Sequence, residues 1–137
     1  MTSDASGETD DGQALRLVCV VDDDTSVLRS LWNLLDSAGL PAETFGSAEA
    51  FLESDRALQA GCLVLDLQLP QMSGIELFMR LMSAERRVPI VILTAERDPN
   101  VRQRLLREGA IAFLTKPFRA ADVLVAVKSA LALGQLA

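Results

Sequence analysis

Short apolar runs alternate with amphipathic stretches along most of this chain. Apolar runs predict strands at about 16–22, 62–66, 88–93 and 111–115, and a weaker strand is expected at 41–45. Between them, helical spacing of apolar residues predicts helices over 25–38, from Ser47 to Gly61, from Gly74 onward, over 99–108 and over 120–133. This alternation predicts an α/β fold, a doubly wound five-stranded parallel sheet with helices on both faces and right-handed crossovers.

Several polar residues and one proline fit the ends of the predicted helices. Asp24 is expected to cap the helix at 25–38, and Ser47 the next helix, since both side chains can accept hydrogen bonds from free N–H groups of a first turn. Pro99 suits the first turn of the helix at 99–108. The helix between Ser47 and Gly61 is predicted to turn Ala50, Phe51 and Leu58 inward.

Length and composition indicate one soluble domain. The chain has 137 residues, half of them apolar, which is enough to bury a core. We expect a disordered acidic tail at 1–13, the folded domain at 14–133 and a C-terminal end at 134–137. Since no apolar stretch approaches the ~20 residues of a membrane span and no signal peptide is recognisable, we expect a cytoplasmic protein without membrane contact.

The two cysteines suggest no metal or redox chemistry. Cys19 and Cys62 lie inside apolar runs, the chain has no histidine, and no C-x-x-C motif occurs. These features argue against a zinc site and against a Cys-His nucleophile. We expect two reduced cysteines in the core.

Functional polar groups follow four of the predicted strands. Asp22 and Asp23 end the first run, Asp66 the third, Thr94 the fourth and Lys116 the fifth. The carboxyl ends of parallel strands meet at one edge of the sheet, which is where open α/β folds place their sites. We therefore expect these five side chains to gather at that edge.

Such a group of side chains favours a cation and a phosphoryl group. Two carboxylates about 4 Å apart repel each other by roughly 4 kcal/mol at an effective dielectric constant near 20, so converging acids need a cation. Oxygen ligands favour Mg²⁺ or Mn²⁺, and a carboxylate such as Asp66 can act as a nucleophile that forms an acyl phosphate. Alone, each residue has an ordinary alternative: Thr94 could close a turn, and Lys116 could be solvated.

Charge is unevenly distributed along the chain. The net charge is -6, but residues 86–128 hold 4 acids against 9 bases, whereas 14–85 hold 11 acids against 4 bases. The C-terminal half therefore has the composition of a basic face for a partner, although an ordinary solvated surface would explain any single arginine equally well.

The motifs at the strand ends resemble the receiver domains of bacterial response regulators over about 14–133. The matching segments are Val21-Asp22-Asp23, Leu65-Asp66-Leu67-Gln68-Leu69-Pro70 with Ser73-Gly74, Leu93-Thr94-Ala95 and Lys116-Pro117-Phe118. Their flanks, Thr44-Phe45-Gly46-Ser47-Ala48-Glu49 and Gly61-Cys62-Leu63-Val64-Leu65-Asp66, are similar to receivers of nitrogen-fixation regulators with LuxR-type output domains.

The resemblance implies details of the fold and of the metal site. It implies the flavodoxin-like strand order 2-1-3-4-5 and a cis bond before Pro117. Asp66 would be the phosphoacceptor and a metal ligand. Asp23 and the main-chain carbonyl of Gln68 would bind the metal directly, and Asp22 would act through a metal-bound water.

The resemblance also implies how a signal would arise. Lys116 would contact the phosphoryl group, and Thr94 and Phe113 would form a switch pair. A histidine kinase or a phosphotransfer protein would be the donor, and the 94–128 face would control an output partner or a homodimer. The domain itself would not contact nucleic acid, an output domain is absent from this chain, and only self-phosphorylation and self-dephosphorylation are expected as catalysis.

Two other functions stay open at this point. An aspartate-nucleophile phosphatase or phosphotransferase acting on small molecules would typically carry a second acid two residues after the nucleophile, where this chain has Gln68, and a cap domain. A phosphorylation-independent interaction module is the other alternative. The complete set of acids argues against that alternative, because a degenerate receiver usually lacks one of these residues.

Overall fold

The computed structural model describes residues 16–85 and 87–134. The predicted acidic tail at 1–13 and residues 135–137 of the predicted C-terminal end lie outside these residues. Within the described part, no helix is both long enough and apolar enough to cross a membrane.

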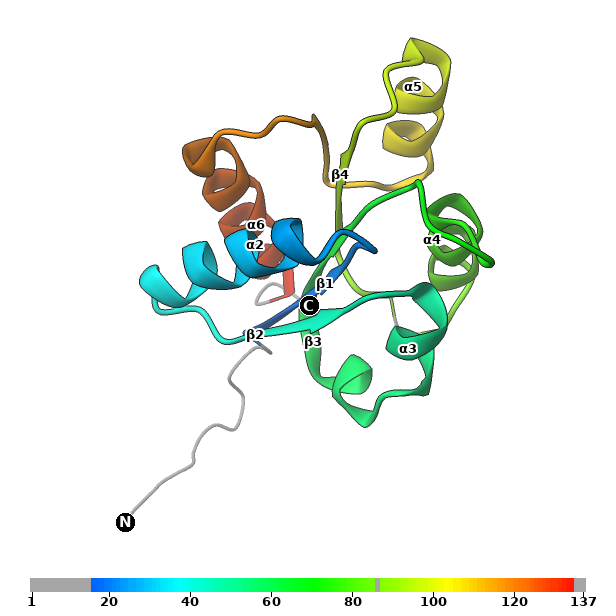
Figure 1. Ribbon diagram of the computed structural model, residues 1–137. Helices are drawn as coiled ribbons and strands as arrows, with labels where there is room; N and C mark the ends of the chain where they lie inside the picture. The colour runs from blue at the N-terminus through cyan, green and yellow to red at the C-terminus, as the bar shows by residue number, and fades with distance from the viewer. Residues whose placement is uncertain (1–15, 86, 135–137) are drawn as a thin grey trace.

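Parallel strands form one sheet at the centre of the molecule (Figure 1). The strands are β1 Leu17–Val21, β2 Ala42–Phe45, β3 Ala60–Leu65, β4 Ile90–Thr94 and β5 Ala112–Thr115, in the order β2-β1-β3-β4-β5. Every residue of β1, β3 and β4 is buried, which explains their uninterrupted apolar sequences, since a parallel sheet is covered on both faces. The predicted fold class and the implied strand order are confirmed.

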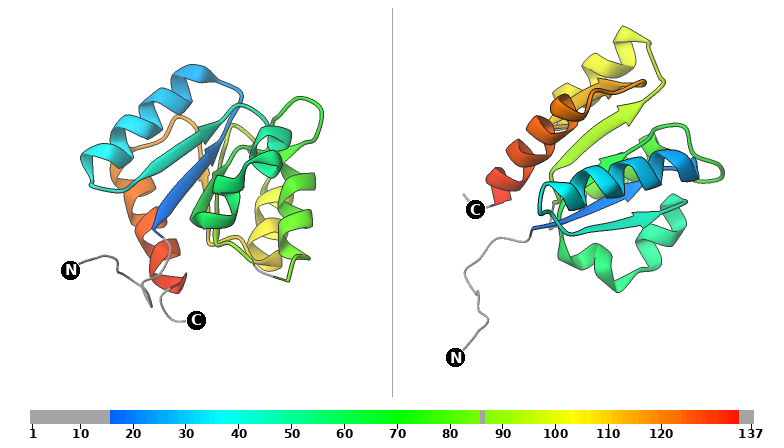
Figure 2. Two further views of the ribbon diagram at one scale, coloured as in Figure 1. Left: turned by 90° about the horizontal axis from the view of Figure 1, so that it is seen from below. Right: turned by 60° about the vertical axis from the view of Figure 1, so that its left-hand side comes forward.

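Helices cover both faces of the sheet (Figure 2). On one face, α2 Thr25–Ser37 and α6 Ala120–Gly134 pack a core that includes Leu31, Leu35 and Val127. On the other face, α3 Ala48–Glu53, α4 Gly74–Met82 and α5 Pro99–Glu108 pack a second core with the side chains of Phe51 and Phe78. The sheet thus separates two apolar cores.

The capping predictions are confirmed. The Asp24 carboxylate accepts hydrogen bonds from the N–H groups of Ser26 at 2.9 Å and Val27 at 3.4 Å, at the start of α2. The Ser47 hydroxyl accepts one from Ala50 at the start of α3, and Pro99 is the first residue of α5. Asp24 therefore has a structural role beside the acids of the sheet edge.

The helix predicted between Ser47 and Gly61 is wrong in its second half. The helix α3 ends at Glu53, and a separate 3-10 helix, η1, spans Asp55–Gln59. Ser54 between them has an extended backbone, with φ −91° and ψ 135°, and its hydroxyl starts the new turn by accepting from Arg56 N–H. Consequently Phe51 is buried as predicted, but Ala50 is exposed and Leu58 is 72% exposed.

The prediction that Gly61 ends a helix is wrong, because Gly61 lies inside β3. Leu17 pairs with Ala60 and Val18 pairs with Cys62, so the register against β1 shifts at this glycine. An extra residue in one strand forms a bulge, and glycine is common at such places because it has no side chain to pack.

Both cysteines are buried in the core, as predicted, on opposite faces of the sheet. Burial raises the pKa of Cys19 from 9.0 to about 11 and that of Cys62 from 9.0 to about 12. The thiols therefore stay protonated in the folded protein at neutral pH. Because each thiol has a higher pKa in the folded state than in the unfolded state, its contribution to stability is complete at any pH below the unfolded pKa. This contribution is lost as the pH rises through the pKa of the folded state.

We expect neither cysteine to react with a thiol reagent in the native protein at pH 8, because the nucleophilic thiolate is both scarce and covered. Both should react at once in denaturant. Counting released thionitrobenzoate with and without denaturant measures this difference. Rapid reaction of the native protein would show instead that β1 or β3 opens easily.

Candidate functional site

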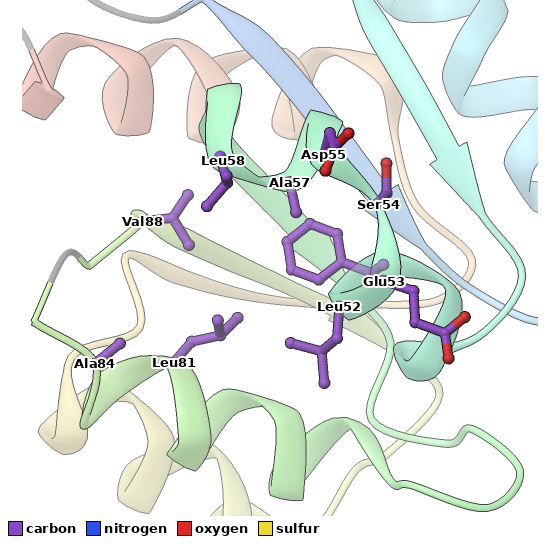
Figure 3. Close-up of a pocket in the computed structure, with 10 residues that line it drawn as sticks. Leu52, Glu53, Ser54, Asp55, Ala57, Leu58, Leu81, Ala84 and Val88 are labelled. Atoms are coloured by element: carbon purple, nitrogen blue, oxygen red, sulfur yellow. The ribbon is translucent and has the colours of Figure 1, made fainter.

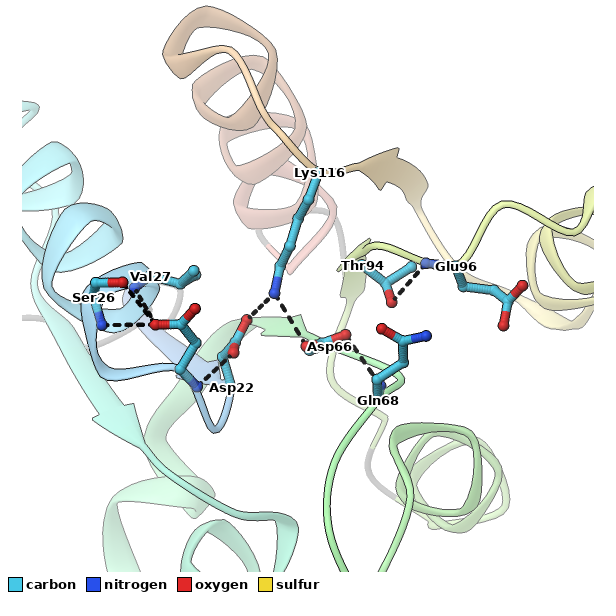
Figure 4. A network of polar contacts seen from close by, with 9 residues as sticks. Asp22, Ser26, Val27, Asp66, Gln68, Thr94, Glu96 and Lys116 are labelled. Carbon is cyan, nitrogen blue, oxygen red and sulfur yellow. Dashed lines mark hydrogen bonds and ion pairs between the residues drawn. The ribbon is translucent and has the colours of Figure 1, made fainter.

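The carboxyl ends of β1, β3, β4 and β5 bring together the side chains of Asp22, Asp66, Thr94 and Lys116 (Figure 4). Lys116 extends from the end of β5 toward two carboxylates. Its Nζ atom lies 2.7 Å from Oδ2 of Asp22 and 3.1 Å from Oδ2 of Asp66. These residues are 94 and 50 positions away from Lys116 in the sequence, so the sheet topology alone makes this cluster.

Three carboxylates form the acidic part of the site. Asp22, Asp23 and Asp66 each offer one oxygen, and these oxygens lie within 4.8 Å of one another. Asp22 is 2% exposed and Asp66 is 4% exposed, while Asp23 faces solvent. One ammonium group lies among three carboxyl groups, and this set of hard oxygen donors fits a divalent cation.

The protonation of Asp22 and Lys116 depends on their mutual contact. Burial raises the pKa of Asp22, while hydrogen bonds from Lys116 and from the Asp24 N–H oppose this rise. Burial alone would lower the pKa of Lys116, but its hydrogen bonds with Asp22 and Asp66 outweigh burial and raise the pKa. Lys116 is therefore a permanent cation of the site at neutral pH, and it offsets part of the repulsion between the acids.

The loop after Asp66 is folded tightly against it. The Gln68 N–H donates to Oδ1 of Asp66 over 3.1 Å, and the Gly74 N–H donates to the Leu67 carbonyl over 3.0 Å. A Cβ atom on Gly74 would overlap the main-chain oxygen of Asp66 and would lie 2.5 Å from the Leu67 Cα. Glycine at position 74 therefore allows α4 to start directly beside the backbone of Asp66.

The predicted switch residues are neighbours on β4 and β5. Thr94 pairs with Thr115, two residues after Phe113, so the side chains of Thr94 and Phe113 lie on the same face of the sheet. Thr94 is fully buried, and its hydroxyl accepts from the Glu96 N–H at 3.3 Å. Phe113 is buried at 6% exposure.

An arginine covers the ring of Phe113. The guanidinium carbon of Arg102 lies 5.9 Å from the centre of the ring, and its Nη1 donates to the Phe113 carbonyl at 3.3 Å. A cation over an aromatic face is attracted by the ring, so Arg102 stabilises this buried position.

Sequence reasoning missed two contacts near the site. The guanidinium of Arg97 donates to the main-chain oxygen of Lys116 at 2.8 Å and joins the loop after β4 to the loop after β5. The bond between Lys116 and Pro117 is cis, as the resemblance implied. The Glu49 carboxylate accepts from the Met72 N–H at 2.9 Å, although the sequence indicated only an acid in the first turn of α3. No sequence signal identifies either main-chain partner.

The structure has a separate apolar hollow between η1 and α4 (Figure 3). Its volume is about 380 Å³, and its lining includes Phe51, Leu58, Leu81 and Val88. None of the acids of the sheet edge lines it. The candidate site is therefore the carboxyl edge of the sheet, and this hollow is separate from it.

Known proteins are similar to this chain in sequence and in fold. TmoT, a response regulator protein of Ectopseudomonas mendocina, is 39% identical over 117 residues, which cover 85% of this chain and 53% of that protein. The transcriptional regulatory protein FixJ of Bradyrhizobium diazoefficiens is 37% identical over 114 residues, covering 83% and 56%. A solved structure of the response regulator StyR is 48% identical with a TM-score of 0.79, covering 86% of this chain and 60% of that one.

The likeness extends over most of this chain but not over most of its relatives. The chain spans about half the length of the curated relatives it matches. The family model of the response regulator receiver domain matches residues 18–128, which include every residue of the acidic cluster and the lysine beside it. The protein therefore belongs to the response regulator receiver domain family.

Proposed function

We propose that Asp66 accepts a phosphoryl group from a histidine kinase or a phosphotransfer protein, as the phosphorelay switch of a two-component system. The observation that carries this proposal is the convergence of Asp22, Asp23 and Lys116 on Asp66 at the carboxyl edge of the sheet. Receivers of this family work with such donors, and the family match supports the same role here. No histidine occurs in this chain, so a donor phosphohistidine must lie outside it.

The proposed cofactor is Mg²⁺, or Mn²⁺ in its place. Asp23, Asp66 and the main-chain carbonyl of Gln68 would hold the ion, and Asp22 would act through a metal-bound water. When bound, the ion supplies positive charge that neutralises oxygens of the transferred phosphoryl group. The excess of carboxylates over ammonium groups in the described cluster supports this assignment.

The residues of the chain would divide the transfer between them. A carboxylate oxygen of Asp66 attacks the phosphorus atom, an oxygen–phosphorus bond forms, and the nitrogen–phosphorus bond of the donor histidine breaks. The Lys116 ammonium then pairs with one phosphoryl oxygen. The Thr94 hydroxyl, which accepts from the Glu96 N–H in this structure, turns to donate to a second phosphoryl oxygen. Water later cleaves the acyl phosphate and resets Asp66, so self-dephosphorylation is the only turnover proposed.

The test uses acetyl phosphate as a small phosphoryl donor. Incubation with Mg²⁺ should add the mass of one phosphoryl group to the intact chain, and prior removal of divalent ions with a chelator should prevent the gain. A chain that gains no mass with Mg²⁺, or that gains it equally with a chelator, would contradict the proposed chemistry.

Asp23→Asn should weaken metal binding without unfolding the domain. Removing one of three clustered charges relieves repulsion, so without metal the free energy of unfolding should hold or rise by about 1 kcal/mol. Paramagnetic resonance of free Mn²⁺ measures the affinity, and urea titration measures the stability. A large loss of stability would show that Asp23 mainly holds the loop after β1.

We further propose that the face formed by α5, β5 and α6 carries the output. This face presents exposed arginines that can pair with acids of a partner or of a second copy; they are Arg97, Arg102, Arg104, Arg107 and Arg119. Movement of the Thr94 hydroxyl toward phosphorylated Asp66 would draw in the loop after β4, which the Arg97–Lys116 contact joins to β5. Phosphorylation would then strengthen a homodimer or the docking of an output domain, such as a LuxR-type one.

Thr94→Ala should uncouple this response while Asp66 remains modifiable. In the wild-type protein, phosphorylation is expected to change the free energy of dimerisation or docking by about 1–3 kcal/mol. The variant should lose this coupling. Light scattering and amide exchange across 94–128, with and without a phosphoryl mimic, measure the coupling. Thr94→Ser keeps the hydroxyl and should keep the response. If phosphorylation changed neither the molar mass measured by light scattering nor the amide protection of 94–128 in the wild-type protein, the output would lie on another face.

The setting proposed for this switch is the cytoplasm. The free, buried thiols of Cys19 and Cys62 suit a reducing compartment. Contact with nucleic acid would belong to an output domain rather than to this receiver.

A further inference from the structure

A carboxylate outside the acidic cluster contacts the loop that follows Asp66. Glu49 lies in the first turn of α3, and its Oε2 accepts a hydrogen bond from the Met72 N–H at 2.9 Å. The two residues are 23 positions apart, so the bond joins α3 to the loop between β3 and α4.

The loop held by Glu49 has an unusual path. Its start is bound to Asp66 through the Gln68 N–H, and its end is pressed against Asp66 at Gly74. Between these points Gln71 has a φ of 60°, in the left-handed region that residues with a side chain seldom adopt. The middle of the loop therefore needs an external contact to keep this path, and the Met72 N–H, next to Gln71, receives it.

The position of one oxygen of the Glu49 carboxylate is unfavourable in itself. Its Oε1 atom is buried and has no hydrogen-bond partner within the described part of the chain. An acid that served only the helix dipole would keep both oxygens in water, because an unpartnered buried oxygen costs free energy. The carboxylate is instead turned toward the loop, which indicates that its contact with Met72 is the reason for its position.

We propose that Glu49 is a positioning residue for metal binding at Asp66. It acts through the loop: its contact with Met72 keeps the path of the main chain between Asp66 and Gly74, and thereby the direction of the Gln68 carbonyl. This inference rests on the proposed function, in which that carbonyl holds the ion. Outer contacts of this kind typically change metal affinity by about 10–100-fold, and we expect about tenfold here because Asp23 and Asp66 remain.

Three variants of Glu49 and one control separate this role from simple stabilisation. Glu49→Ala removes the acceptor, and Glu49→Asp shortens it by one methylene, so both should bind Mn²⁺ about tenfold more weakly. Glu49→Gln keeps an acceptor oxygen and should bind within about twofold of the wild type. Ser47→Ala removes the cap of the same helix but leaves the Met72 contact, so it should lower stability without lowering affinity.

The readouts are Mn²⁺ affinity by paramagnetic resonance and the rate of mass gain from acetyl phosphate at rising Mg²⁺. For Glu49→Ala the rate deficit should disappear at saturating Mg²⁺, whereas a damaged fold would lower the rate at every concentration.

Equal Mn²⁺ affinity in Glu49→Ala and the wild type, or an equal loss of affinity in Ser47→Ala, would overturn the inference. If Glu49→Ala does not fold, Glu49→Asp against Glu49→Gln decides. A wild-type chain that neither binds Mn²⁺ nor gains mass would instead overturn the proposed function.

Discussion

Asp66→Asn should abolish the gain of a phosphoryl group that the wild-type chain shows with acetyl phosphate and Mg²⁺. The amide oxygen of asparagine is not an adequate nucleophile at neutral pH, and the other two acids of the cluster lie on a different strand end. The substitution also removes one negative charge beside Lys116, so metal binding should weaken together with the chemistry. Intact mass after incubation measures the result, and the expected loss is complete.

The fold should survive this substitution. Asparagine has nearly the shape of aspartate, its oxygen can still accept from the Gln68 N–H, and Lys116 keeps its contact with Asp22. Asp36→Asn, an exposed acid on α2 outside the site, is the matched control and should be phosphorylated like the wild type. If the asparagine variant at position 66 gained mass equally well, another residue would be the acceptor.

Gly74→Ala should lower the free energy of unfolding by about 3 kcal/mol, the largest effect on stability that we expect of one added methyl group. The new Cβ would overlap the main-chain oxygen of Asp66 and approach the Leu67 Cα to 2.5 Å. Main-chain atoms cannot rotate away as a flexible side chain would, so α4 or the end of β3 must move. Either movement displaces Asp66, and phosphorylation should slow as well.

Gly46→Ala provides the matched control on the loop between β2 and α3. A Cβ at Gly46 would meet no atom within 4 Å, and its backbone is outside the left-handed region. Alanine there should leave stability unchanged or raise it by up to about 1 kcal/mol, because it restricts the unfolded chain. Urea titration of both variants, with acetyl phosphate labelling of each, tests the contrast. A Gly74→Ala protein as stable as Gly46→Ala would mean that the loop after Asp66 relaxes freely.

The alternation of apolar runs and amphipathic stretches was sufficient to predict the architecture. Strands buried on both faces must be apolar along their length, as β1, β3 and β4 are, and this pattern does not depend on knowing the neighbours of a strand. The helix caps at Asp24 and Ser47 were predictable because a cap contacts main-chain groups two or three residues away. The strand order, by contrast, came from the family resemblance, because apolar runs do not specify which strands pair.

The members of the candidate site were predictable for a similar reason. Acids, a hydroxyl and a lysine at the ends of parallel strands must gather at one edge once the sheet forms, and the structure brings Asp22, Asp66 and Lys116 into direct contact. The sequence did not indicate that Lys116 bridges both carboxylates. That geometry depends on the side-by-side placement of β1 and β3 and on the reach of Lys116 from β5.

By itself, then, the sequence determined the class of fold, the helix caps and which polar residues follow the strands, since each depends on periodicity or on contacts within a few residues. Only the tertiary structure decided the break of the second helix at Ser54 and the bulge at Gly61. It also decided the closeness of Gly74 to Asp66 and the contact of Glu49 with Met72. The bulge, the approach of Gly74 to Asp66 and the Glu49 contact involve main-chain atoms of distant segments, and main-chain atoms are the same for every residue type, so no pattern of side chains records them.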